Sequence, residues 1–355
     1  MYFEGGIWGL LYTHNETAKY CLDVDAHDCD GDEDEGDELQ DIHICILYQT
    51  GDEFFGYQSV RSNRFYLIHD PKGSKLQYVE DYHDTLDKLS SQNLTPFKHM
   101  FAGYQYMEAQ PKLEAKKRFK VIKDNWAKMK NENQNHTIHV ELAHFNYHHT
   151  IHYVMKYLFN YTDSIGFNEQ ELFAVYNQLV FYKNRYEDSE DDEQEIGPSS
   201  SRLTHYDSLN LIYPLIKRFL VEKYPNISRV QYHTLGHMIT WYDPEIWESG
   251  EESLLRTGLT SATYCALNSK NTDTPLWKTH SMNKLDLSQL SSNMTIIENF
   301  SVLNNTGDFM QFIKLEDTKF ICGVTTTPTC IKPSKLTGLG DNISSTGFTY
   351  QNRIK

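Results

Sequence analysis

Residues Thr137–Phe145 (TIHVELAHF) have the apolar and β-branched composition of a buried β-strand, and the segments after them alternate between helix and strand. The pattern predicts a helix at His148–Phe159, a short strand at Asp163–Phe167 and a second helix at Glu169–Tyr182. Strands separated by helices are typical of a parallel sheet that is covered on both faces. We therefore predict an α/β fold whose ligands bind beyond the carboxyl ends of the strands.

The same alternation extends in both directions along the chain, and two acidic runs interrupt it at Asp23–Asp41 and Glu187–Glu195. We assign residues 1–41 to a divergent N-terminal segment that ends in an acidic linker, and 42–355 to one domain with a disordered acidic insertion at 187–201. Further strands are predicted at Ile42–Tyr48, Arg64–Ile68, Arg229–Leu235, Phe309–Leu315 and Lys319–Thr325, and further helices at Lys112–Met129 and Ser208–Lys223.

The overall charge excludes several classes of partner. Among 355 residues, 49 acidic side chains outnumber 33 basic ones, which gives a net charge of −16. This field repels polyanions, so we expect no nucleic-acid partner and no anionic membrane. No stretch approaches the roughly 20 apolar residues that span a bilayer, and no signal peptide is visible. The six scattered cysteines predict neither a disulfide scaffold nor a zinc ribbon.

Near the C-terminus, the sequence Gly338-Leu339-Gly340-Asp341 has the composition of a tight turn that opens a helix. The free amide groups at the start of a helix form a ready anion site. An aspartate in the first turn would sit where a phosphoryl group binds and could accept a proton from an attacking hydroxyl. The pattern alone also occurs in ordinary turns, so its meaning depends on the residues upstream.

Two glutamates lie where predicted strands end. Glu141 closes the strand at Thr137–Phe145, and Glu171 follows the strand at Asp163–Phe167. With Asp341 they would place three carboxylates at one edge of the sheet, which suits a hydrated Mg²⁺. The alternative is that a glutamate at a helix start only favours the helix dipole.

A zinc site is one interpretation of the histidines at and before the predicted helix, because His144/His148 and His148/His152 are spaced i,i+4, which a helix can present to zinc. No His-Glu-x-x-His motif is present, so we predict that His144, His148, His149 and His152 face solvent. The chain also lacks a Gly-x-Ser-x-Gly elbow and a glycine-rich phosphate loop, which argues against a serine hydrolase and a P-loop ATPase.

Three motifs in this order, His139-Val140-Glu141, Asn168-Glu169-Gln170-Glu171 and Gly338–Asp341, resemble the ADP-dependent sugar kinases of the ribokinase-like superfamily. The residues within the motifs are most similar to those of the eukaryotic ADP-dependent glucokinases, and the resemblance spans about 42–355. Other matching segments are Tyr48–Gly51, Ser62–Phe65, His69-Asp70, Gly103–Glu108 and Arg229–Leu235.

This resemblance implies a three-layer α/β/α sandwich with a mainly parallel sheet and a partial small lid, whose strands lie within about 42–75. It implies a monomer that transfers the β-phosphoryl group of ADP to the 6-hydroxyl of glucose, giving glucose 6-phosphate and AMP with Mg²⁺. The implied site residues are Asp341 as general base; Gly338, Leu339, Gly340, Arg64 and His233 for the nucleotide; and Glu141, Glu171 and Asp341 for Mg²⁺. For His233, a packing role is the alternative.

The chain departs from the family at its start. Family members carry an earlier portion with a sugar-contacting Gly-Gly-Asn segment, whereas Gly5-Gly6 is followed here by Ile7. Two alternatives therefore stay open, a catalytically silent nucleotide-binding remnant and a kinase for another sugar such as fructose 6-phosphate. The eukaryotic members enter the secretory pathway, so the resemblance implies that compartment although no signal peptide is visible.

Overall fold

The computed structural model describes residues 8–12, 42–48, 53–54, 57–58, 63–69, 82, 85–86, 88–89, 97–133, 135–180, 212, 215, 223–234, 236–266, 277–279, 294–300, 310–315, 318–326, 328–330 and 339–354. The chain divides into two compact units, Met1–Tyr78 and Val79–Lys355. The two acidic runs lie outside the described residues, and so does most of the helix predicted at Ser208–Lys223.

The first unit contains a small antiparallel sheet. Its order is β1 (Trp8–Tyr12), β2 (Ile42–Tyr48) and β5 (Asn63–His69), and β3 (Glu53–Phe54) pairs with β4 (Tyr57–Gln58). The two strands predicted in this region are confirmed as β2 and β5. Their assignment to a lid stays a prediction.

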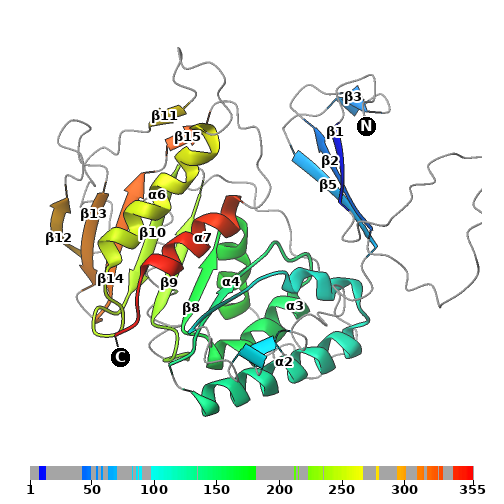
Figure 1. Ribbon diagram of the computed structural model, residues 1–355, viewed down its shortest axis with the longest axis horizontal. Coiled ribbons are helices and arrows are strands. Elements are labelled where there is room, and N and C mark those ends of the chain that lie inside the picture. The colour runs from blue at the N-terminus through cyan, green and yellow to red at the C-terminus, as the bar shows by residue number, and fades with distance from the viewer. Residues whose placement is uncertain are drawn as a thin grey trace, which may run out of the picture. The chain divides into compact units, whose positions relative to one another are not determined.

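The second unit is built on an eight-stranded sheet with the order β12-β13-β14-β10-β9-β8-β7-β6 (Figure 1). Strands β6 to β9 are parallel, as predicted, whereas β10, β14, β13 and β12 continue the sheet in antiparallel pairs. The difference follows from the connections, because a tight turn joins β9 to β10 while helices join β7 to β8. The bounds are β6 (Lys98–Phe101), β7 (Thr137–Glu141), β8 (Ser164–Phe167), β9 (Arg229–His233), β10 (His237–Tyr242), β12 (Met294–Phe300), β13 (Met310–Leu315) and β14 (Ile321–Thr326), beside a separate pair of β11 (Trp277–Thr279) and β15 (Pro328–Cys330).

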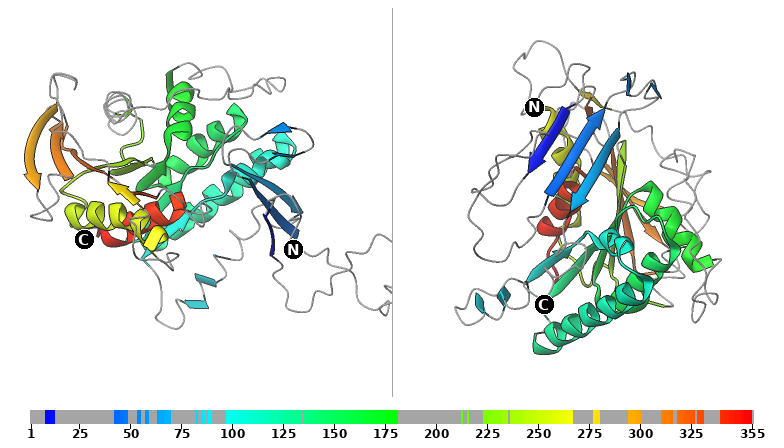
Figure 2. Two further views of the ribbon diagram at one scale, coloured as in Figure 1. Left: turned by 90° about the horizontal axis from the view of Figure 1, so that it is seen from above. Right: turned by 90° about the vertical axis from the view of Figure 1, so that its right-hand side faces the viewer.

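Helices cover both faces of this sheet, which confirms the predicted three layers (Figure 2). On one face, α6 (Gly250–Ala266) and α7 (Leu339–Tyr350) pack against each other and against the central strands. On the other face lie α2 (Lys112–Glu132), α3 (His148–Tyr153) and α4 (Glu169–Val180). The predicted helix at His148–Phe159 is interrupted, since α3 passes into a π-helix at Val154–Leu158 and a 3₁₀ turn at Phe159–Tyr161.

The position of α2 follows from its sequence pattern. Its buried side chains recur every three or four residues, which is the spacing of one helical face. The ring of Trp126 lies 4.7 Å from that of Phe101 on β6, so this face joins the helix to the edge of the sheet. The buried positions are Ala115, Phe119, Ile122, Trp126 and Met129.

Two histidines of α3 correct the prediction from sequence. His148 and His149 are buried, with 4% and 6% of their surface exposed, because α3 lies against both α2 and α4. His152 is half-buried, and His144, before the helix, is exposed as predicted. Within the described residues, no helix combines the length and the apolar character needed to cross a membrane.

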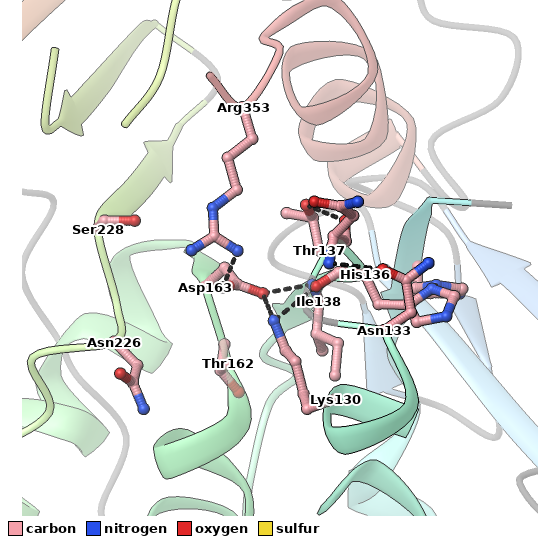
Figure 3. Close-up of polar contacts among 12 residues, drawn as sticks. Lys130, Asn133, His136, Thr137, Ile138, Thr162, Asp163, Asn226, Ser228 and Arg353 are labelled. Atoms are coloured by element: carbon pink, nitrogen blue, oxygen red, sulfur yellow. Dashed lines mark hydrogen bonds and ion pairs between the residues drawn. The ribbon is translucent and has the colours of Figure 1, made fainter. Parts of the chain in front are cut away.

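A buried ion-pair cluster closes the amino ends of the parallel strands (Figure 3). The carboxylate of Asp163, which directly precedes β8, accepts hydrogen bonds from Lys130 of α2, from the amide of Ile138 at 2.7 Å and from Arg353 at 2.8 Å. The backbone carbonyl of Asp163 also accepts from the amide of Ser228 at 2.9 Å. One residue therefore ties together a helix, three strands and the C-terminal segment.

The direction of α7 is set at the same amino edge. The ammonium group of Lys98, at the start of β6, donates to the backbone carbonyls of Phe348, Thr349 and Gln351 at 3.1, 2.6 and 3.0 Å. A lysine in this position satisfies carbonyls that have no partner inside the helix. Because the C-terminal end of α7 lies at the amino edge, its N-terminal end lies at the carboxyl edge of the strands.

Candidate functional site

The carboxyl edge of the parallel strands brings two of the predicted site residues close in the fold. Glu141 is the last residue of β7 and pairs in register with Gly166 of the neighbouring β8. Glu171 lies in the first turn of α4, which begins shortly after β8 ends. Both side chains are buried, with 2% and 4% exposure. This edge therefore holds two buried carboxylates on adjacent strand connections.

The carboxylate of Glu141 lies over the tip of β8. A Cβ atom on Gly166 would come within 1.9 Å of Glu141 Oε2, so only glycine leaves room for the carboxylate there. Two imidazole nitrogens approach its oxygens: His139 Nε2 is 3.3 Å from Oε2, and His233 Nε2 is 3.8 Å from Oε1. The sequence left a nucleotide role and a packing role open for His233, and the structure puts it beside this carboxylate.

Glu171 has a local structural role. Its two carboxylate oxygens accept hydrogen bonds from the backbone and side-chain nitrogens of Asn168, at 2.8 and 2.9 Å. The side-chain oxygen of Asn168 in turn accepts from the amide of Gln170 at 2.8 Å. This reciprocal arrangement is a capping box with asparagine at the N-cap. The alternative interpretation from sequence, a glutamate that supports a helix start, therefore describes part of what Glu171 does.

Helix α7 begins at this same edge. Leu339, Gly340 and Asp341 form its first turn, while Gly338 and the side chain of Asp341 lie outside the described part of the chain. One turn further on, the buried hydroxyl oxygen of Ser344 lies 3.4 Å from His233 Nδ1. The first turns of α7 thus lie near Glu141, with Ser344 and His233 between the helix and the carboxylate.

Two other predictions for the site concern Arg64 and the metal ion. Arg64 belongs to β5 in the first unit, and its side chain is outside the described part. Among the described side chains, no group of three or more His, Cys, Asp or Glu residues is arranged to hold a metal ion. The predicted trio of Glu141, Glu171 and Asp341 therefore stays a prediction.

Electrostatics at this edge favour neutral histidines. Burial lowers the pKa of His233 to about 4. Burial, followed by the charge of Arg229 and by His233, lowers the pKa of His139 well below its usual value. Both rings are therefore uncharged near neutral pH, and each offers one N–H group and one acceptor nitrogen.

The polar residues beneath α7 were not predicted as part of the site. Arg229 is completely buried, and its guanidinium donates to Ser164 Oγ at 2.9 Å, to Gln351 Oε1 at 2.7 Å and to Gln231. Burial lowers its pKa to about 9, although the charge of Glu141 opposes this shift. A signal was available, since Arg229, Gln231 and His233 alternate along a strand predicted to be buried and so share one face.

Comparison with known proteins agrees with this architecture. The family model for the ADP-specific phosphofructokinase/glucokinase conserved region matches residues 14–350. A curated ADP-dependent glucokinase from Bos taurus is 22% identical over 323 residues, which cover 88% of this chain and 58% of that protein. This chain thus spans a little over half the length of that relative.

Two solved structures share the fold. A hypothetical ADP-dependent phosphofructokinase from Pyrococcus horikoshii OT3 superposes with a TM-score of 0.52 at 15% identity, over 86% of this chain and 62% of the other. An ADP-dependent kinase in complex with fructose 6-phosphate and ADPβS gives a TM-score of 0.53 at 14% identity, over 90% and 66%. With the family model matching nearly the whole sequence, the chain belongs to the family of ADP-specific phosphofructokinases and glucokinases.

Proposed function

We propose that this protein is a Mg²⁺-dependent glucokinase that transfers the β-phosphoryl group of ADP to the 6-hydroxyl of glucose. The observation that carries the proposal is the carboxyl edge, where the buried carboxylate of Glu141 is connected through His233 and Ser344 to the helix that begins at Leu339–Asp341. The bovine glucokinase, at 22% identity, supports glucose as the sugar.

The chain's own residues would act as follows. The free amides at the start of α7 would bind the transferring phosphoryl group and stabilise its negative charge. Asp341 would accept the proton of the sugar hydroxyl while the hydroxyl oxygen forms a bond to the β-phosphorus of ADP. At the same time the bond between the β-phosphorus and the oxygen that bridges to the α-phosphate breaks. AMP leaves with the electron pair of that bond. His233 and Ser344 would keep the start of α7 at a fixed place beside Glu141.

The donor set at this edge fits Mg²⁺. The ion prefers oxygen ligands and usually keeps several waters, so one or two carboxylates suffice to hold it beside a substrate phosphate. Glu141 would hold the ion together with Glu171, whose oxygens already accept from Asn168 and would therefore act mainly through water. When bound, the ion would neutralise charge on the diphosphate.

A coupled assay tests the proposal with the full chain, ADP or ATP as donor, and glucose or fructose 6-phosphate as acceptor. We expect glucose 6-phosphate to form with ADP and Mg²⁺, and Asp341→Asn to lower kcat by at least 100-fold, the order of magnitude of a lost general base. Circular dichroism and the urea midpoint of this variant should match those of the wild type.

Other outcomes would replace the proposal by a named alternative. Turnover of fructose 6-phosphate alone would keep the family chemistry and change the sugar. Measurable binding of ADP or AMP without turnover of either sugar would indicate a catalytically silent nucleotide-binding remnant. Turnover retained in Asp341→Asn would exclude Asp341 as the base.

We also propose that the chain acts as a monomer in the secretory pathway, as the family resemblance implies. Sedimentation equilibrium of the purified chain tests the first point, because a dimer would have twice the 41.5 kDa mass. Imaging of the tagged protein expressed from its full transcript tests the second, since a diffuse cytosolic signal would contradict it.

A further inference from the structure

A row of hydrogen bonds crosses the sheet beneath α7 and connects two buried charges. It begins at Arg229 on β9, whose Nη1 lies 2.9 Å from Ser164 Oγ on β8. The same hydroxyl oxygen lies 2.8 Å from His139 Nδ1 on β7, and the far side of that ring lies 3.3 Å from Glu141 Oε2. All four residues are buried. A cation at one end thus reaches a carboxylate at the other through two neutral groups.

The ends of this row fix the direction of its hydrogen bonds. A guanidinium can only donate, so Ser164 Oγ accepts from Arg229. A neutral imidazole that gives its one N–H to Glu141 has a free lone pair on Nδ1, so Ser164 directs its own proton to that nitrogen. A carboxylate can only accept, so His139 donates from Nε2 to Glu141. Reversing any one of these bonds would set two donors or two acceptors against each other. The row therefore has one consistent proton arrangement, with His139 protonated on Nε2.

Packing holds the same ring from the other side. The ring of Phe348, on α7, stacks on that of His139 with centroids 5.0 Å apart and planes 25° apart. The lowered pKa of His139 agrees with a neutral imidazole that carries one proton. The plane of the ring is thus set by α7, its tautomer is set by the carboxylate of Glu141, and Ser164 donates to the nitrogen that remains.

We propose that Arg229 is a positioning residue of the phosphoryl-transfer site, which acts through Ser164 and His139 to hold the carboxylate of Glu141 in the orientation that binds the metal ion. Second-shell hydrogen bonds of this kind orient ligands before the ion arrives. The role of Glu141 in this statement rests on the proposed function, whereas the proton arrangement of the row does not.

Substitution of Arg229 itself would not separate the positioning role from the contribution of this side chain to packing. Its guanidinium also donates to Gln351 and lies 5.9 Å from the centre of the Trp247 ring, so its removal would disturb α7. Substitution of Ser164 leaves Arg229 in place and breaks the row at its middle. Ser164→Ala removes the hydroxyl, and Ser164→Thr restores one.

The matched control is Ser253→Ala on α6. Ser253 is also buried, and its hydroxyl donates to the carbonyl of Gly347 at 2.6 Å, so this variant likewise removes a buried hydroxyl beneath α7. Among the contacts of the described residues, none joins Ser253 to the row, so this variant should lower stability without affecting Glu141.

The first measurement is ¹⁵N NMR of the histidine rings in the full chain, with His139 assigned by its loss in His139→Gln. We expect the wild type, Ser164→Thr and Ser253→Ala to show the Nε2–H tautomer with a hydrogen-bonded Nδ1. Ser164→Ala should keep that tautomer, while its Nδ1 resonance shifts because the hydrogen bond from Ser164 is lost. An Nδ1–H tautomer in the wild type, or an unchanged signal in Ser164→Ala, would overturn the proposal. This result does not depend on whether the protein is a kinase.

The second measurement is Mn²⁺ affinity in the presence of ADP, followed by electron paramagnetic resonance, with Mn²⁺ as the probe for the Mg²⁺ site. Loss of a second-shell partner typically lowers metal affinity by about 10- to 100-fold. We expect that loss in Ser164→Ala, recovery in Ser164→Thr and none in Ser253→Ala. Equal affinity in all variants would refute the positioning role. No Mn²⁺ binding by the wild type, with the expected NMR result, would refute the proposed metal site and leave the proton arrangement intact.

Discussion

The two ends of strands β7–β9 each hold a buried carboxylate, and the two differ in what surrounds them. At the amino edge, Asp163 is 3% exposed and pairs with Lys130 and Arg353 (Figure 3). At the carboxyl edge, Glu141 is 2% exposed and has the imidazoles of His139 and His233 at 3.3 and 3.8 Å. One carboxylate has cations in direct contact, while the other has neutral rings.

This difference separates a stabilising site from a binding site. A buried carboxylate paired with two cations has its charge compensated inside the protein, and removing it leaves those cations uncompensated. The two imidazoles beside Glu141 are uncharged near neutral pH, so they do not themselves neutralise its carboxylate. We therefore infer that the amino edge mainly stabilises the fold, and the proposed function assigns the chemistry to the carboxyl edge. The following substitutions test that division.

Asp163→Asn should have the largest effect on stability. Breaking a buried pair costs about 3–5 kcal/mol. We expect the lower end of this range, because Lys130 and Arg353 would keep their charges but are 19% and 33% exposed to solvent. Urea denaturation measures the loss, and catalytic activity per folded molecule should stay close to that of the wild type. As a control, Glu252→Gln breaks an exposed pair with Arg256 at 3.5 Å and should cost less than about 1 kcal/mol. Equal midpoints for the two variants would contradict the assignment.

Gly166→Ala should produce the opposite pattern, with activity lost and the fold retained. The new methyl group would lie 1.9 Å from Glu141 Oε2 and 2.9 Å from Ser344 Oγ. Because Oε2 ends a rotatable side chain, the carboxylate can swing away and spare the backbone. A displacement of about 1 Å can reduce the rate by roughly 100-fold.

Steady-state kinetics and urea denaturation together check this prediction. The matched control is Gly236→Ala, where the added Cβ would have no atom within 4 Å, and its kinetics should not change. A Gly166→Ala protein with normal turnover would show that the position of Glu141 does not matter to the reaction.

The third prediction concerns the stability of the fold at acid pH, to which His233 at the carboxyl edge should contribute. The pKa of His233 is about 4 in the folded protein, against 6.5 as its ordinary value. Between these values the unfolded chain binds the proton first, so His233 makes the folded state less stable as the pH falls from about 6.5 towards 4. Between pH 7 and pH 5 the loss should be about 2 kcal/mol.

Urea denaturation at both pH values measures this loss. His233→Gln, which cannot titrate, should remove this share of the loss. The rest should remain, because burial also lowers the pKa of His139 and lowers that of His152 to about 4. An equal dependence in the variant and the wild type would assign the acid sensitivity to other groups.

Much of the sheet could be predicted because its central strands are short segments with β-branched and aromatic residues that stand between helical patterns. The segments around Glu141, Gly166 and His233 were found in this way, and each forms a strand of the parallel half. Strand β10 and helix α6 were not predicted. Both lie in the region after the turn at Gly236, where the pattern changes from strand–helix alternation to a hairpin.

The polar site beneath α7 was harder to predict, for a physical reason. Arg229 and Gln351 are 122 residues apart, and their contact exists only because α7 runs antiparallel to β9 across the sheet. Single-residue patterns likewise gave the wrong surroundings for His148 and His149. Their helix is flanked by two others, so both faces are covered.

The contact between Lys98 and the last turn of α7 has a consequence for the opposite end of that helix. Lys98 Nζ donates to three backbone carbonyls and to Asn352 Oδ1, so the helix is anchored at the end remote from Asp341. A helix of 12 residues is about 18 Å long. It can act as a rigid lever, and a tilt of about 3° at the anchor moves the other end by about 1 Å. A substitution at Lys98 could therefore shift the start of α7 while every residue of the candidate site stays unchanged.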